Sequence, residues 1–319
     1  MVKQKTALIL GISGGLAQIT AKVLRRENPE LRIIGVDNRP ISKLPELSGV
    51  VYKKLRYSRN DFERLFRSYK FDYVFHLGRM THAKSNPRAS LAQRLDLNVM
   101  GTNRILELSL EHNIKKLIML STWHVYGAFP DNSIFINENS LLRASIQNAD
   151  LRDVVEMDQL STNFMWKNQA EIETVVFRPC SIIGPTIQNS MTKYLTNNFA
   201  PVGIDYDPMM QFIHEYDMAK VLSRALKSIP TGIYNVAPDD FISIQDAKKF
   251  ITPKALPFSI IALEGIAKII NQTSWSVPSY LIDYLKYPCL LSNKELQKHL
   301  PKNFMRYSVQ DSLELMRLP

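Results

Sequence analysis

The sequence predicts an α/β fold in which a doubly wound parallel sheet carries helices on both faces. Three observations support this prediction. Short runs rich in Ile, Val, Leu and Phe alternate with longer segments whose apolar residues recur at helical spacing along the first 125 residues. The short runs are almost continuously apolar, as in strands that are buried on both faces. Regular alternation of strand and helix is typical of a parallel sheet.

The elements follow one another in a regular order. The first half has five predicted strands, at Ala7–Leu10, Arg32–Val36, Val50–Leu55, Tyr73–Leu77 and Lys116–Leu120. Three helices are predicted between them, at Leu16–Arg26, Asp61–Tyr69 and Leu91–His112. Two further strands, Thr174–Arg178 and Gly232–Val236, and a helix, Tyr216–Ser228, are predicted later in the chain.

The chain divides into a main domain and a smaller part. We expect residues 1–183 to form the main domain, with 212–240 returning to it. Residues 184–211 and 241–319 would then form a smaller C-terminal α/β lobe. The segment from Pro185 to Pro208 is interrupted by Pro, Gly and Asn and is predicted to consist of loops with short elements.

Composition limits the classes of protein. The formal net charge is +10, but Lys and Arg are dispersed without a long basic run, which favours an ordinary basic surface over nucleic-acid binding. Cys180 and Cys289 form no close pair and no cluster with histidine, so we expect reduced thiols. The six histidines show no metal spacing, and we expect no metal. No apolar run approaches the ~20 residues of a membrane span, so a cytoplasmic protein is expected.

A glycine-rich turn follows the first predicted strand. In Gly11-Ile-Ser-Gly14-Gly-Leu-Ala17 the glycines allow a tight turn and close approach of a pyrophosphate, and the helix that follows directs its free N–H groups at it. Asp37 ends the second strand, where a carboxylate can bind the ribose hydroxyls of NAD and repel the 2′-phosphate of NADP. The sequence therefore predicts a Rossmann domain that binds NAD. Arg39 could offset the repulsion, so NADP remains the less favoured alternative.

Several motifs occur in order from residue 7 to 240. They are Gly11-x-x-Gly14-x-x-Ala17, Asp72-Tyr-Val-Phe-His-Leu-Gly78, Asn98-Val-Met-Gly-Thr-Asn103, Leu120-Ser-Thr-Trp-His-Val-Tyr-Gly127, Arg178-Pro-Cys-Ser-Ile-Ile-Gly-Pro185, Gln211-Phe-Ile-His-Glu-Tyr-Asp217 and Gly232-Ile-Tyr-Asn-Val236. The set resembles the extended short-chain dehydrogenases/reductases, the NAD-dependent epimerase/dehydratase group. The last motifs are similar to those of a bacterial subgroup labelled UDP-glucose-4-epimerase-like, an isomerase class acting on nucleotide sugars.

The resemblance implies residues for the cofactor and the substrate. The cofactor residues would be Gly11, Ser13, Gly14 and Leu16 at the pyrophosphate, Asp37 and Asn38 at the adenosine ribose, Leu77 and Gly78 beside them, and Leu120, Ser121, Pro179 and Ile182 toward the nicotinamide. A substrate cleft would lie between the sheet and the C-terminal lobe, with Met80, Ser181 and Gln211 as its predicted contacts. A homodimer is also common in the family.

The catalytic residues depart from the family pattern. The family uses a Ser or Thr with a Tyr-x-x-x-Lys on the next helix, and Thr122 occupies the first position. The helix expected to carry the pair contains neither Tyr nor Lys between residues 150 and 160. The best register places Asp150 at the tyrosine position and Val154 at the lysine position, while other registers pair Asn148 with Arg152 or Arg152 with Glu156. We therefore take Thr122, Asp150 and Tyr126 as the catalytic candidates.

Other candidates are weaker. Tyr216-x-x-x-Lys220 lies too late in the chain and is interpreted as coincidental. His124 is two residues from Thr122, but we expect a structural histidine. Met210 replaces the arginine that commonly grips a sugar-nucleotide diphosphate.

Two functions remain open. The first is an epimerase/dehydratase-like oxidoreductase acting on a hydroxyl of a sugar or sugar nucleotide without the usual dyad. The second is a catalytically inactive NAD-binding sensor or assembly protein.

Overall fold

The fold was analysed in a computed structural model of the chain, which describes residues 4–40, 46–78, 91–198, 200, 202–253, 257–262 and 278–317. The strands are β1 Thr6–Leu10, β2 Arg32–Asp37, β3 Val50–Lys54, β4 Tyr73–His76, β5 Lys116–Leu120, β6 Glu173–Pro179, β7 Ser181–Ile183, β8 Val202–Gly203, β9 Met209–Met210, β10 Phe212–His214, β11 Gly232–Val236, β12 Ile242–Ser243 and β13 Pro257–Phe258. The helices are α1 Gly15–Glu27, α2 Arg59–Ser68, α3 Leu91–Arg94, α4 Gly101–Glu111, α5 Ala144–Gln147, α6 Arg152–Lys167, α7 Ser190–Thr196, α8 Glu215–Arg224, α9 Ile244–Ile251, α11 Leu281–Tyr284, α12 Lys294–Gln297 and α13 Val309–Arg317.

A seven-stranded sheet forms the centre of the molecule. Its order is β11-β6-β5-β4-β1-β2-β3, and every neighbouring pair is parallel. The order reverses direction at β1 and β4, where ligands of open α/β sheets bind beyond the carboxyl ends of the strands. The predicted Rossmann-type doubly wound α/β fold is confirmed.

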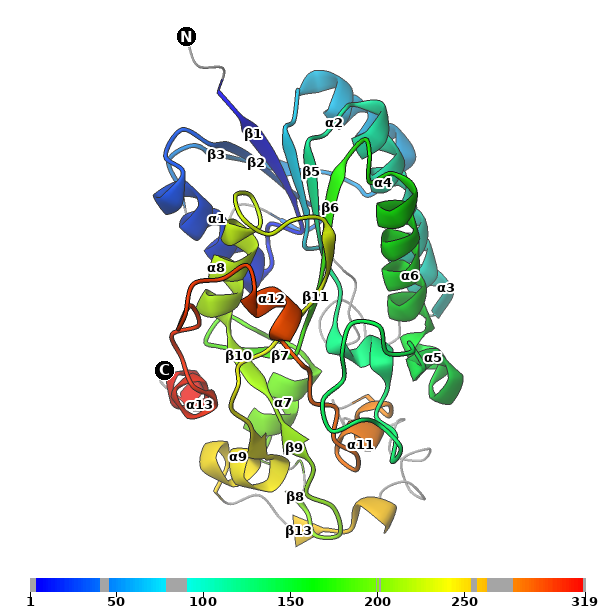
Figure 1. The fold of residues 1–319 in the computed structure, drawn as a ribbon, viewed down its shortest axis with the longest axis vertical. Helices are drawn as coiled ribbons and strands as arrows, with labels where there is room; N and C mark the ends of the chain where they lie inside the picture. The colour runs from blue at the N-terminus through cyan, green and yellow to red at the C-terminus, as the bar shows by residue number, and fades with distance from the viewer. Residues whose placement is uncertain are drawn as a thin grey trace.

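Helices cover both faces of this sheet. In Figure 1, α1 and α8 lie on one side, and α2, α4 and α6 lie on the other. Alternate side chains of β1 pack on opposite faces of the sheet. Ala7 and Ile9 belong to one hydrophobic cluster, and Leu8 and Leu10 belong to the second. Each face of the sheet therefore has its own core, as the apolar strand runs predicted.

The smaller elements gather at the carboxyl end of the sheet. Three two-stranded pairs, β7 with β10, β9 with β12 and β8 with β13, lie in the lower part of Figure 1 with α7, α9 and α11. Strand β11 and helix α8 return to the main sheet, because β11 pairs with β6 and α8 packs against α1.

Some elements differ from the prediction. The single helix expected over Leu91–His112 is divided into α3, a π-helical segment Leu95–Met100 and α4. Helix α6 begins only at Arg152, and Asp150 lies in a separate 3-10 turn, Ala149–Leu151. The apolar spacing of residues 260–270 also predicts a buried helix, and most of this segment falls outside the described residues.

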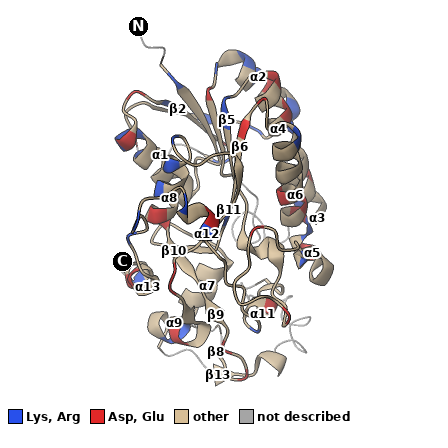
Figure 2. Ribbon diagram, in the orientation of Figure 1, with Lys and Arg blue, Asp and Glu red and all other residues tan. Residues whose placement is uncertain are grey.

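Charged residues are dispersed over the fold. Figure 2 shows Lys and Arg interspersed with Asp and Glu on the outer helices. On α2, for example, Arg59 and Arg64 are paired with Glu63 and Asp61. Among the helices that the structure describes, none is long and apolar enough to cross a membrane.

Candidate cofactor and substrate cleft

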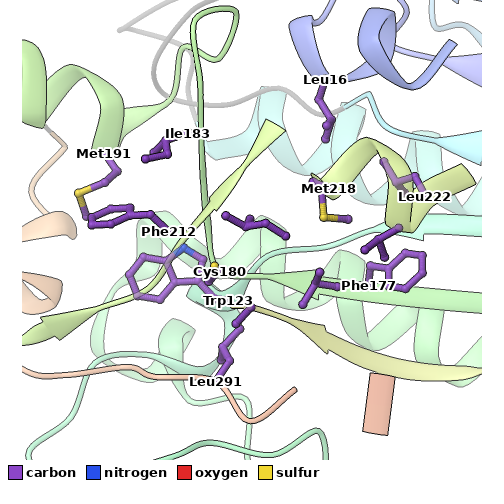
Figure 3. Close-up of a cluster of buried hydrophobic side chains, with 14 of the residues drawn as sticks. Leu16, Trp123, Phe177, Cys180, Ile183, Met191, Phe212, Met218, Leu222 and Leu291 are labelled. Atoms are coloured by element: carbon purple, nitrogen blue, oxygen red, sulfur yellow. The ribbon is translucent and has the colours of Figure 1, made fainter. Parts of the chain in front are cut away.

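A cleft of about 900 Å³ opens at the carboxyl edge of the sheet. Its wall is formed by the residues that follow β1, β2, β4, β5 and β6, together with the segment from Thr186 to Met191 and Tyr280. Below it, apolar side chains from α1, α7, α8, β6 and β10 gather with Trp123 and Cys180 in one cluster (Figure 3). The cleft has the volume of a typical ligand site and a rigid floor.

The glycine turn after β1 meets the geometric requirements for a phosphate site. Gly11 has a φ of +83°, and a Cβ there would strike the backbone of Gly78. Gly14 is the N-cap of α1 and supplies no side-chain cap, so the amides of the first turn remain available to an anion. The buried Ser13 Oγ has no hydrogen-bond partner among the described residues. The turn therefore fits the pyrophosphate of a dinucleotide.

Asp37 stands at the end of β2 and is almost fully buried. Its carboxylate accepts hydrogen bonds from the Ser13 backbone N–H at 3.0 Å and from Arg39 Nε and Nη2 at 3.0 and 2.9 Å. Burial opposes ionisation, but the hydrogen bonds and positive charge of Arg39 hold the pKa of Asp37 below its ordinary value. The sequence did not predict that Arg39 would form a bidentate pair with Asp37.

The segment after β7 lies directly over the glycine turn. A Cβ on Gly15 would strike Thr186, so the glycine permits this close approach. Thr186 is held in turn by Glu215, which accepts from the Thr186 backbone N–H at 3.1 Å and from its hydroxyl at 2.6 Å. Burial raises the pKa of Glu215. Glu215 therefore positions one wall of the cleft from the start of α8.

Thr122 and His124 lie together after β5. Both line the cleft, and Thr122 Oγ1 is 2.9 Å from His124 Nδ1. Trp123 and Tyr284 pack around the imidazole ring at centroid distances of 4.5 and 4.9 Å. His124, which the sequence indicated as structural, is thus part of the cleft wall beside Thr122.

A buried polar network lies behind this wall. The Arg178 guanidinium forms a bidentate pair with Asp158 at 2.9 and 2.6 Å, and Asp158 also accepts from the Ser121 hydroxyl. Tyr126 Oη donates to Asn235 Oδ1 at 2.7 Å and accepts from Arg178 at 3.0 Å. This network fixes the ends of β5, β6 and β11 relative to α6.

Tyr126 is therefore a correction to the catalytic prediction. Its ring is 1% exposed, and it lies outside the cleft wall that the described residues form. Burial raises the pKa of its phenol, since the tyrosinate would lose its hydration. In this structure the phenol is engaged with Arg178 and Asn235, behind the cleft wall.

Asp150 and Gln211 also lie away from the described wall. Asp150 precedes α6, and its side chain is 47% exposed and paired with Arg94 at 3.1 Å. Gln211 is buried, donates to the carbonyls of Pro238 and Leu291, and accepts from the Leu291 backbone N–H at 2.7 Å. Both have structural partners where catalytic and substrate contacts were predicted. The predicted substrate residue Met80 lies outside the described residues.

The cleft is lined here by Leu151, at the end of the 3-10 turn, and by Asp153 and Val154 in the first turn of α6. Val154 stands at the register predicted for the family's lysine, and its side chain carries no charge. Asp153 is 1% exposed, accepts from Asn98 Nδ2 at 2.6 Å and lies 3.7 Å from Arg94 Nε. The sequence missed Asp153. Helix α6 begins later than predicted, and its starting residue determines which side chains face the cleft. Alignment to a sequence motif does not reveal where the helix begins.

The remaining predicted residues come together in the cleft. Of those that the resemblance assigned to the cofactor, all except Ser13 line the cavity: Gly11, Gly14, Leu16, Asp37, Asn38, Leu77, Gly78, Leu120, Ser121, Pro179 and Ile182. Thr122 and Ser181 line it as well. Among the described residues there is no group of three or more His, Cys, Asp or Glu that could hold a metal ion.

The family model described as the NAD dependent epimerase/dehydratase family matches residues 7–237. The chain belongs to this family. The matched region runs from β1 to just beyond β11, so it includes the whole seven-stranded sheet and the residues that form the cleft floor.

Individual relatives are distant. An uncharacterised protein of Mycobacterium tuberculosis is 23% identical over 248 residues, covering 76% of this chain and 64% of the relative. A dTDP-D-glucose 4,6-dehydratase of Dictyostelium discoideum is 24% identical over 265 residues, covering 76% of this chain and 61% of the relative. The chain thus matches less than two thirds of the length of these relatives.

Solved structures share the fold across nearly the whole chain. The UDP-glucuronic acid 4-epimerase of Bacillus cereus, solved in complex with UDP-glucuronic acid and NAD, superposes with a TM-score of 0.73 at 18% identity, covering 98% of each chain. At this identity the similarity extends the family fold to the C-terminal elements, which lie beyond the family match.

Proposed function

We propose that this protein is an NAD-dependent oxidoreductase of the epimerase/dehydratase type that acts on a hydroxyl of a sugar or sugar nucleotide. One observation carries the proposal: a single cleft joins the glycine turn at Gly11 to the Thr122–His124 pair. Such a cleft can place a dinucleotide along the strand ends with its reactive ring near a polar pair.

The cofactor would lie with its pyrophosphate at the amides of α1 and its adenosine ribose near Asp37. The bound nicotinamide ring would supply the acceptor for a hydride from the substrate carbon. Ser121, Thr122 and Ile182 would flank that ring, and Thr122 Oγ1 would bind the reacting oxygen. NAD is proposed over NADP because the buried Asp37 carboxylate stands where a 2′-phosphate would lie.

The substrate class follows from the family and its solved members. The Bacillus cereus structure contains UDP-glucuronic acid, and other solved relatives are UDP-glucose and dTDP-glucose enzymes. In this chain the substrate side of the cleft is lined by Ser181, Ser190 and Asn189, which offer hydroxyl and amide groups to a sugar. We propose residues 1–183 with 212–240 as the NAD-binding part and the remainder as the substrate lobe, in a chain that acts in the cytoplasm as a homodimer.

Purified protein tests the proposal. Enzyme loaded with NAD is mixed with an excess of UDP-glucose, UDP-glucuronic acid or dTDP-glucose, and reduction of the bound NAD is followed during the first turnover by stopped-flow absorbance of NADH, because an epimerase or dehydratase returns the hydride before the turnover ends. We expect reduction with at least one sugar nucleotide, and we expect Thr122→Val to slow it about a hundredfold, the usual contribution of a positioned proton-transfer group. The proposal fails if the wild-type protein is inert toward all three.

A catalytically inactive NAD-binding protein is the second candidate. The observation that favours it is the cleft wall at α6, where Val154 and Leu151 occupy the surface that a tyrosine–lysine pair would need. For this candidate we expect NAD to bind at the same affinity in wild type and Thr122→Val, with no reduction in either.

A further inference from the structure

Thr122 and His124 form a hydrogen-bonded pair in the wall of the cleft. The two side-chain atoms, Oγ1 and Nδ1, are 2.9 Å apart. Thr122 is 6% exposed, so its hydroxyl is largely removed from bulk water. A separation of 2.6–3.2 Å is the range over which a positioned base takes a proton from a hydroxyl.

The imidazole is held in one orientation by three aromatic rings. Trp123 lies at a centroid distance of 4.5 Å, while Tyr284 and Tyr280 meet the ring edge-on at 4.9 and 5.5 Å. The Tyr284 hydroxyl also donates to the backbone carbonyl of His124 at 2.7 Å. These contacts hold the plane of the ring, and within that plane the hydrogen bond to Thr122 Oγ1 places Nδ1 toward the threonine.

We infer that His124 is the proton acceptor that takes the place of the missing tyrosine, and that it acts through Thr122. The inference rests on the proposed function. In the oxidation step the substrate hydroxyl proton passes to Thr122 Oγ1 as the threonine proton passes to His124 Nδ1. The carbinol C–H pair of electrons leaves as a hydride to the nicotinamide of NAD, and the carbinol becomes a carbonyl. The products are the ketone, NADH and a protonated imidazole.

The other polar groups considered for catalysis are less suited to this role. The Tyr126 phenol donates to Asn235 and lies behind the wall. The Asp150 carboxylate is partly exposed and ion-paired with Arg94. Asp153 lines the cleft, but its carboxylate accepts from Asn98 and stands beside the Arg94 guanidinium, and no hydrogen bond joins it to Thr122 among the described residues. Of these groups, His124 is the one whose side chain is hydrogen-bonded to the Thr122 hydroxyl, which would bind the reacting oxygen of the substrate.

The first test needs no substrate. A hydrogen bond between Oγ1 and Nδ1 can be made with either atom as donor, but Nδ1 can accept a proton only if it carries none in the resting state. Ring ¹⁵N spectra of the full chain with NAD, assigned by comparison with His124→Asn, report the tautomer. We expect the proton on Nε2 and an Nδ1 signal that moves in Thr122→Val and stays unchanged in His299→Asn. A resting Nδ1–H overturns the inference.

The second test separates proton acceptance from positioning. Asparagine at 124 places an amide oxygen near the position of Nδ1 and can hold the Thr122 hydroxyl, but it cannot take the proton. With UDP-glucose as probe, we expect hydride transfer to fall about a hundredfold in His124→Asn. We expect added imidazole to restore part of the rate in His124→Ala, and His299→Asn to keep the wild-type rate.

The outcomes distinguish this inference from the proposed function. An active His124→Asn variant overturns the inference alone, since it shows that the histidine only positions Thr122. A wild-type protein that reduces no NAD with any of the three sugar nucleotides overturns the proposed function and the inference with it.

Discussion

At the scale of single residues, we propose that the preference for NAD over NADP depends on the Asp37–Arg39 pair. The carboxylate is buried, whereas the guanidinium is 43% exposed and closes over it with two hydrogen bonds. The negative charge of Asp37 would repel a 2′-phosphate, and the positive charge of Arg39 weakens this repulsion. The balance between NAD and NADP is therefore a property of the pair.

Removing the guanidinium tests this balance. In Arg39→Leu the carboxylate keeps its charge without the counter-charge, so we expect NADPH to bind about tenfold more weakly (roughly 1.4 kcal/mol), while NADH binding changes less. The affinities are measured by quenching of tryptophan fluorescence, with Arg26→Leu on the exposed end of α1 as the control. An unchanged ratio of the two affinities would show that Arg39 takes no part in cofactor choice.

His76 at the end of β4 gives the fold a pH dependence. Its ring is 7% exposed and lies 3.1 Å from Thr102 Oγ1, and burial lowers its pKa to about 4. In the unfolded chain an ordinary histidine pKa is about 6.5, so between pH 6.5 and 4 the unfolded state binds the extra proton. The stabilisation that comes from burying the neutral ring is therefore fully present above pH 6.5, and it is lost as the pH falls from 6.5 toward 4.

We expect this titration to be visible in the free energy of unfolding. Between pH 6.5 and 5 the wild type should lose roughly 1.5 kcal/mol that a His76→Asn variant does not lose, because asparagine has no proton to take up. Urea unfolding at several pH values measures the slope, and His112→Asn serves as the control. Equal slopes in wild type and His76→Asn would rule out His76 as the source.

At the scale of elements, the short helix α7 depends on a buried lysine. Lys248 on α9 is fully buried, and its ammonium donates to the carbonyls of Tyr194, Leu195 and Asn197 at 2.7, 3.1 and 2.7 Å. These are carbonyls at the end of α7, which a helix of seven residues cannot satisfy by itself. Lys248 thereby ties α9 to the helix that supplies Ser190 and Met191 to the cleft.

Replacing this lysine should destabilise the C-terminal part of the molecule. Lys248→Met keeps much of the apolar stem but removes the ammonium donor from the carbonyls of Tyr194 and Asn197, while the Leu195 carbonyl keeps the Thr252 hydroxyl as a donor. We expect a loss of about 2–3 kcal/mol in the free energy of unfolding. The adjacent Lys249 is exposed and bonds only to Gln245 among the described residues, so Lys249→Met is the matched control. Denaturant unfolding of both variants measures the difference, and similar losses in the two would contradict the capping role.

The elements of the main sheet could be predicted because their signals are local. The periodicity of apolar residues located all seven strands, and the glycine turn and Asp37 located the start of the cofactor site. The π-helical segment Leu95–Met100 has no comparable signal, since apolar residues in a helix of either type recur at similar intervals. Strands of two residues such as β9 and β12 are too short to show an alternating pattern.

The site residues show the same division. Eleven of the residues predicted for the cofactor line the cleft, and they lie on motifs whose geometry is set by neighbouring residues. Tyr126, by contrast, lies behind the cleft wall, where it is hydrogen-bonded to Asn235, 109 positions away in the sequence. Gln211 is hydrogen-bonded to Leu291, which is 80 positions away. Partners at such distances are decided by tertiary packing, and a motif read by itself cannot reveal them. The surroundings of His124 could not be predicted for a related reason: its aromatic neighbours Tyr280 and Tyr284 come from the far end of the chain.

At the scale of the whole molecule, the sheet edge and the C-terminal elements meet around one cleft. The β1 turn, the end of β5 and the Thr186 segment lie on its wall, and Glu215 on α8 holds the last of these against Gly15. Binding of a dinucleotide would contact all three regions at once. The central claim is therefore that NAD binds along this cleft with its pyrophosphate at the start of α1.

Calorimetric titration of NAD into the wild-type chain and into Gly14→Asp tests this claim most directly. A carboxylate at the N-cap of α1 places a negative charge where the pyrophosphate would lie and supplies the cap that the phosphate would otherwise replace. We predict one NAD per wild-type chain and at least a hundredfold weaker binding in Gly14→Asp, with the variant's unfolding free energy not reduced. Absence of NAD binding to the wild type, or equal affinity in the two proteins, would contradict the account.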